Sequence, residues 1–147
     1  IYFAVNALAL GAASIINAKL VMIYGMRYLS MRAMGTFCVI AVAFLPVVVA
    51  YDGVPPLWAF MAFCMSSFFC VSILFGNLNA MAMEPMGKIA GMAAALIGSV
   101  STLISLPIGV AIGQMFRGTL TPMVASFALI GAAAFALLYR TSKISEE

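Results

Sequence analysis

Residues capable of acid–base or metal chemistry are scarce in this chain. The sequence has four acidic residues, seven Lys or Arg and no His. Asp52 and Glu84 fall between apolar stretches, and Glu146 and Glu147 end the chain. His is the commonest metal ligand and general base, and catalysis needs a titratable group beside the substrate. We therefore expect neither an enzyme nor a metal centre.

The three cysteines lie inside apolar stretches, at Cys38, Cys64 and Cys70. No CxxC motif or Cys/His cluster accompanies them. This pattern is typical of buried apolar thiols rather than of redox or metal sites.

Uncharged polar residues offer hydrogen bonding instead. On a helix that turns about 100° per residue, positions 11 apart lie within about 20° of each other. Asn6 and Asn17 therefore share one face, and Ser66 and Asn77 share another with Phe69 between them. Such stripes can line a substrate cavity, where Phe69 adds apolar contact, or they can join neighbouring helices by hydrogen bonds. Both interpretations remain open.

Small residues give one face of the segment 89–116 very little bulk. They recur at spacings of three or four residues, at Gly98, Thr102, Ser105, Gly109 and Gly113. Because small side chains let helix backbones approach closely, we favour helix packing as the role of this face. Thr102 is also a candidate for the substrate cavity.

Pro107 lies inside the same segment. Its ring lacks an N–H, so the carbonyl of Leu103 loses its usual partner, and we expect a kink. A kinked, glycine-lined helix suggests a gating element between inward-open and outward-open states.

The elements that position these residues follow from composition. Apolar residues make up 66% of the chain and charged residues 7%, against about 45–50% and about 25% in soluble domains. A membrane-spanning helix needs about 20 apolar residues. We predict an all-α integral membrane protein, with a membrane domain at 1–140 and a cytoplasmic tail at 141–147. Its five transmembrane helices are predicted at about 1–24, 31–51, 56–79, 89–116 and 120–140.

Positive charges favour one side of the predicted bundle. Six of the seven basic residues fall on the side that holds the C-terminus, at Lys19, Arg27, Arg32, Lys88, Arg140 and Lys143. Arg117 falls on the opposite side. The positive-inside rule then puts the C-terminus in the cytoplasm, and the scattered charges do not indicate a nucleic-acid partner. Helix 1–24 would start outside without an export signal. We interpret this as a truncation, with further spans upstream; a stand-alone five-span protein is the alternative.

The segment 76–91 resembles a family of transporters. It reads GNLNAMAMEPMGKIAG, with Asn77, Ala80 and Pro85 followed by a G-x-x-A-G motif at 87–91. It is similar to the span 10 to 11 region of the Bcr/CflA (bicyclomycin/chloramphenicol resistance) drug:H⁺ antiporters of the major facilitator superfamily. When the segment 76–91 is aligned with that region, the five predicted helices resemble spans 8 to 12 of the carrier, which are part of its C-terminal six-helix bundle. Family members often carry His where this chain has Lys88.

A weaker resemblance lies after the first predicted helix. Leu20, Gly25 and Arg27 match the cytoplasmic loop signature of the superfamily, whereas Met22 and Ile23 replace its Asp and Arg. The charge relay of the full signature is therefore not expected here. Gly25 can still supply a tight turn and Arg27 an interfacial anchor.

The resemblance implies proton-coupled multidrug export by alternating access in the bacterial inner membrane. It implies no cofactor beyond the proton gradient, and as partners small amphipathic drugs, membrane lipid and the missing N-terminal half of the carrier. That half would hold the coupling carboxylate, because no predicted span contains Asp or Glu. The alternative is a structural five-span protein that oligomerises through the glycine face of 89–116.

Overall fold

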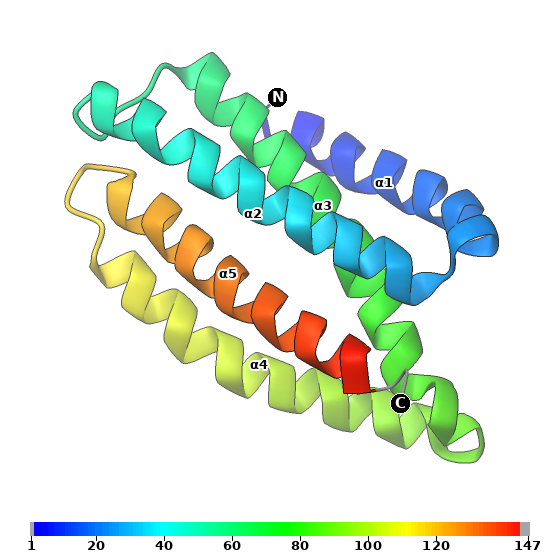
Figure 1. Ribbon diagram of the computed structural model, residues 1–147. Helices are drawn as coiled ribbons and strands as arrows, with labels where there is room; N and C mark the ends of the chain where they lie inside the picture. The colour runs from blue at the N-terminus through cyan, green and yellow to red at the C-terminus, as the bar shows by residue number, and fades with distance from the viewer. Residues whose placement is uncertain (1, 145–147) are drawn as a thin grey trace.

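The computed structural model describes residues 2–144, with the side chains of 6–87 and 89–141. This part of the chain is helical and contains no strand. Figure 1 shows long, roughly antiparallel helices joined by short connections. They are α1 (Tyr2–Tyr24), α2 (Met26–Ala50), α3 (Leu57–Met83), the 3-10 helix η1 (Glu84–Ile89), α4 (Ala90–Gln114) and α5 (Thr121–Ile144).

The five α-helices are long and apolar enough to cross a membrane. The prediction of an all-α protein with five helices of this kind is therefore confirmed. A helix satisfies its backbone hydrogen bonds internally, which is why apolar segments of this length can remain in lipid. Their length and composition fit a multi-pass membrane protein.

The bounds of the helices differ from the predicted ones. Only Gly25 separates α1 from α2, where the sequence suggested a loop up to residue 30. Gly25 has a φ of +80°, and its N–H donates to the Val21 carbonyl at 2.9 Å. Helix α2 begins directly after Gly25. The long side chain of Arg27 can carry its charge to the membrane interface, so the charge does not interrupt the helix. At the other end, α5 continues to Ile144, into the predicted tail; residues 145–147 lie outside the described residues.

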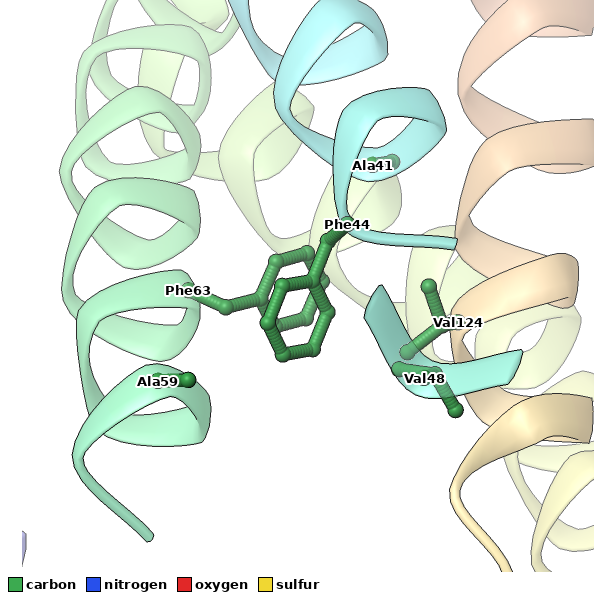
Figure 2. Packing of buried hydrophobic residues seen from close by; sticks show 6 residues of the cluster. All are labelled: Ala41, Phe44, Val48, Ala59, Phe63 and Val124. Carbon is green, nitrogen blue, oxygen red and sulfur yellow. The ribbon is translucent and has the colours of Figure 1, made fainter. Parts of the chain in front are cut away.

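Two apolar clusters hold the bundle together. The first joins α2, α3 and α5, and Figure 2 shows Phe44 and Phe63 at its centre with their rings face to face. The ring centroids lie 4.4 Å apart with an interplanar angle of 9°, a contact worth about 0.5–1.5 kcal/mol beyond area burial. The second cluster joins α1, α2 and α3 through Ala13, Leu29, Ala33, Ile73 and Leu74.

One end of the bundle is closed by two connections that touch. The Leu120 N–H donates to the Gly53 carbonyl at 2.8 Å, linking the α2–α3 loop to the start of α5. Gly53 has a φ of +84°, and a Cβ added to it would lie 2.5 Å from Cβ of Thr119. Glycine is therefore required here both by backbone conformation and by space.

Helix α4 packs less than the others. Figure 1 shows it beside α5 at the edge of the bundle opposite α1. Among its residues only Ala93 is buried, whereas α3 buries seven. The rest of α4 faces the surroundings of the bundle or the cavity described next.

Candidate functional site

The predicted polar stripes do not form one surface. Asn77 of α3 is 2% exposed and faces Asn17 of α1. Each amide donates its Nδ2 to the Oδ1 of the other at 2.9 Å. More than one turn away along the same two helices, the Ser72 hydroxyl donates to the Leu10 carbonyl at 3.2 Å. The Asn17–Asn77 contact is thus an interhelical bond between α1 and α3.

The other predicted cavity residues lie apart from one another. Ser66 and Thr102 are exposed, and each hydroxyl donates at 2.8 Å to a carbonyl of its own helix. Phe69 lines a pocket of about 200 Å³ between α2 and α3, next to Arg32. Asn6 is half-buried on α1. None of these residues lines the larger cavity, of about 770 Å³, that is described next.

The large cavity lies among α2, α3, α4 and α5 and has a volume of about 770 Å³. A volume of this order accommodates a drug-sized molecule. Helix α3 supplies residues three or four positions apart, so they form one face of the helix. The lining from α3 comprises Phe63, Cys64, Ser67, Phe68, Val71 and Leu74.

The cavity wall is aromatic and continuous with the core. Phe63 belongs both to the cluster of Figure 2 and to the lining. Phe127 of α5 lies 6.4 Å from Phe63 and 6.1 Å from Phe37 of α2, measured between ring centroids. These contacts hold three rings of the wall against the packed core.

The polar groups of the cavity are hydroxyls and one thiol. Helix α4 contributes Ser101 and Ser105, and α3 contributes Ser67 and Cys64. Ser67 is 4% exposed, and its hydroxyl has no hydrogen-bond partner in the described part of the chain. Leaving such a group buried and unbonded costs about 1–3 kcal/mol. No side chain of the lining carries a charge.

The predicted gating residues divide between the cavity and the outer surface. Gly109 lines the cavity together with Ser105. A Cβ added to Gly98, Gly109 or Gly113 would meet nothing within 4 Å. Pro107 lies within α4, which continues as one helix from Ala90 to Gln114.

Two of the three loop-signature residues, Gly25 and Arg27, lie together at the α1–α2 end of the bundle. Gly25 and Arg27 line a pocket of about 550 Å³ that also includes Tyr24, Tyr28 and Glu84. The rings of Tyr24 and Tyr28 stack with centroids 5.8 Å apart. Arg27 is exposed there, which suits an anchor at the membrane interface.

The Arg32 guanidinium is held at the same end of the bundle. Its carbon lies 5.3 Å from the centroid of the Tyr28 ring, and its Nε donates to the Tyr28 hydroxyl at 3.1 Å. Leu20 is half-buried and packs against the second apolar cluster. At this end of the bundle, the apolar packing of Leu20 therefore adjoins a group of aromatic and basic side chains.

The sequence prediction singled out Ser66 rather than Ser67, which is the residue that lines the large cavity. Ser66 and Ser67 are adjacent, and the stripe with Asn77 directed attention to Ser66. The spacing of Phe63, Cys64, Ser67 and Phe68 was the available signal, because it marks an aromatic face that carries a hydroxyl.

Comparisons with protein-family models, curated proteins and solved structures gave no match. The geometry of the cavity and the sequence motifs are therefore the basis for assigning a function.

Proposed function

We propose that the chain is the C-terminal part of a multidrug efflux transporter of the major facilitator superfamily, of the Bcr/CflA type. In this proposal the five helices correspond to spans 8 to 12 and move drugs out of a bacterial cell by alternating access. The proton gradient drives transport, and the rest of the carrier completes the bundle.

The observation that carries the proposal is the cavity among α2, α3, α4 and α5. It has the volume of a drug site, about 770 Å³, and its wall combines phenyl rings with a few hydroxyls. Apolar contact is tolerant of ligand shape, whereas a dense array of polar groups selects one ligand. This wall therefore suits a carrier of diverse amphipathic compounds.

The loose packing of α4 supports alternating access. One side of the cavity is formed by α4, in which Ala93 is the one buried residue, while the opposite walls belong to the packed core. A wall that can shift without disrupting the core can change the access to the cavity. The sequence motif at 76–91 covers the end of α3, the whole of η1 and the first two residues of α4.

Proton coupling requires residues beyond these helices. Ion pathways in membranes use intramembrane carboxylates or basic groups. The helices α1 to α5, as the structure describes them, contain neither Asp nor Glu, and Glu84 belongs to η1. We therefore assign the coupling carboxylate to the N-terminal half of the carrier.

The experiment is transport by the complete carrier that contains this chain. Inside-out membrane vesicles should accumulate a neutral fluorescent drug analogue when a proton gradient is imposed, and a protonophore should abolish accumulation. Vesicles with the empty vector serve as the control. Accumulation equal to that control, with the carrier present in the membrane, would reject the function.

A second candidate is a structural protein that oligomerises through α4. The open space at Gly98, Gly109 and Gly113 favours it, because small residues at this spacing admit a second helix. Cysteine crosslinking at Gly113, which is exposed and lies outside the cavity lining, would then trap a homo-oligomer in native membranes. Absence of a crosslinked oligomer, together with proton-dependent accumulation, would decide for the transporter.

A further inference from the structure

Arg32 carries a charge inside a helix that is otherwise apolar enough to cross a membrane. It lies six positions after the first residue of α2, about 9 Å along the helix axis. A cation in such a helix normally pairs with an opposite charge or with carbonyl groups. In the part of the chain that the structure describes, Arg32 forms no ion pair. Its guanidinium is exposed and lacks a counter-ion.

The Tyr28 side chain holds this guanidinium in place. The ring lies under its carbon at 5.3 Å, and the Arg32 Nε donates to the Tyr28 hydroxyl at 3.1 Å. Tyr28 in turn stacks on Tyr24. Among the described residues the two Nη groups of Arg32 have no hydrogen-bond partner, so both remain available. Two such groups in one plane match two oxygens of a phosphate.

Arg32 also lines an apolar groove of about 200 Å³ between α2 and α3. The floor of the groove includes the buried side chains of Ala33, Cys70 and Ile73. Its rim is formed by Arg32 and Thr36, which are exposed, and by Phe69, which is half-buried. A molecule can therefore enter from the surroundings of the bundle. The volume is below the range of about 300–1,000 Å³ for small-molecule sites, but it suits a segment of one hydrocarbon chain.

The charges near the groove favour an anion. No acidic side chain lines the groove. The neighbouring pocket of about 550 Å³ contains Arg27 and Glu84 together with Tyr28, and the described part of the chain holds no ion pair between Arg27 and Glu84. Two guanidinium groups beside Tyr28 thus outweigh one carboxylate. This balance attracts a headgroup with a net negative charge and disfavours one that carries an ammonium.

We propose that Arg32 and the groove between α2 and α3 bind one anionic phospholipid. The Nη groups of Arg32 hold the phosphate, and one acyl chain lies in the groove against Phe69. Basic pockets between membrane helices bind headgroups of this kind. The groove favours a lipid over free phosphate, which would need Arg32 alone. This site shares no lining residue with the cavity of about 770 Å³, and the proposal does not depend on drug transport.

Photoreactive phospholipids test the site on the full chain in lipid nanodiscs. Phosphatidylglycerol and phosphatidylethanolamine carry the same diazirine in one acyl chain, each at the same low mole fraction in phosphatidylcholine. The labelling of Thr36 and Phe69 is divided by the labelling of Leu103, which is 72% exposed on α4 and reports bulk lipid. We expect this ratio to be about 3- to 5-fold higher for phosphatidylglycerol, the range that one Arg near a membrane surface provides.

The Arg32→Gln variant removes the charge and keeps a polar side chain. Its ratio for phosphatidylglycerol should fall to the value for phosphatidylethanolamine. Arg140→Gln is the matched control, because Arg140 is exposed at the same end of the bundle and lines neither the groove nor the neighbouring pocket. It should behave as the wild type. An equal fall in both variants would mean that net charge alone attracts the lipid, and would overturn the site.

Inorganic phosphate separates a lipid from a free anion. At millimolar concentration it should leave groove labelling by phosphatidylglycerol unchanged, relative to sodium chloride of equal ionic strength. Loss of that labelling would show that phosphate alone fills the site and would overturn the lipid.

The unmodified chain can also reject the proposal. Equal ratios for phosphatidylglycerol and phosphatidylethanolamine would overturn the anionic class, since an ammonium would then be accepted beside Glu84. Labelling of the groove no stronger than that of Leu103 with either lipid would reject the site itself. None of these measurements uses a proton gradient, so a carrier without transport activity would leave the lipid site standing.

Discussion

Asn17 and Asn77 exchange two hydrogen bonds at 2.9 Å between α1 and α3, among segments of membrane length. In such surroundings neither amide has water as an alternative partner. The pair therefore fixes the rotation of α1 about its axis relative to α3. Since Asn77 is almost fully buried, its role is better tested by stability than by binding.

We expect Asn77→Leu to lower the free energy of unfolding by about 0.5–2 kcal/mol, because it strands the amide of Asn17. The double variant Asn17→Leu/Asn77→Leu should recover part of that loss, since no unpaired amide remains. Denaturant unfolding in detergent measures both. Additive losses in the double variant would contradict the pairing.

Gly53 offers a second prediction for a single residue. Gly53→Ala places a Cβ at a φ of +84° and 2.5 Å from Thr119. Gly118 shares the φ of +84° but has open space around it, so Gly118→Ala reports the backbone strain alone, about 1–2 kcal/mol. We expect Gly53→Ala to cost at least about 1 kcal/mol more, from overpacking. Thermal unfolding of the two variants compares them, and equal losses would argue against the contact.

The polar residues were predicted less well than the apolar ones, for a physical reason. A helical period places Ser66 and Asn77 on one face, but it does not say which neighbour that face meets. The Asn77 side chain forms hydrogen bonds with that of Asn17, whereas the Ser66 hydroxyl donates to a backbone carbonyl of its own helix. Partners across helices depend on packing between segments distant in sequence, which a single stretch does not encode.

Helix α4 differs from the other elements in combining a proline, a face of small residues and little buried surface. These properties favour motion over rigidity, because few contacts must break when the helix shifts. Its sequence made it recognisable as a membrane helix. Its loose attachment became visible only in the tertiary structure.

In the proposed transporter, the Pro107→Ala variant should alter transport more than it alters the amount of protein in the membrane. Alanine restores the backbone N–H and stiffens α4, so we expect proton-driven accumulation to fall several-fold. Leu106→Ala is the control, because Leu106 is 66% exposed and adjacent. Unchanged accumulation in Pro107→Ala, with normal expression, would count against gating by this helix.

The ends of the helices were harder to predict than their existence. Long uncharged stretches are unmistakable, and each produced a helix. Charges mark the membrane interface, however, and a helix can continue through the interface. Arg27 lies in the first turn of α2 and Arg140 within α5 for this reason.

At the scale of the whole molecule, the alternation of helices separates the connections into two groups. The α2–α3 and α4–α5 connections meet at one end through Gly53 and Leu120. The α1–α2 turn at Gly25 and the segment η1 belong to the other end. From the distribution of Lys and Arg, we predict that the second end faces the cytoplasm.

Labelling of single cysteines tests this topology. In a background without native cysteines, Gly118→Cys should react with an impermeant maleimide in intact cells, because the predicted topology places the α4–α5 connection outside. Gly87→Cys should react only in inside-out vesicles. The reverse pattern would invert the orientation while leaving the fold intact.

The hydrogen bond between Leu120 and the Gly53 carbonyl gives α4 a fixed point near its C-terminal end, since only a short connection separates the two. With 25 residues, α4 extends about 37 Å from that end. A rotation of about 10° there would carry its N-terminal end through an arc of about 6 Å, nearly the width of a phenyl ring. Because η1 adjoins α4 directly and Ala93 is buried near that end, such a rotation would have to carry η1 with it. A small angular change next to Gly53 would therefore be transmitted along α4 to the opposite end of the bundle.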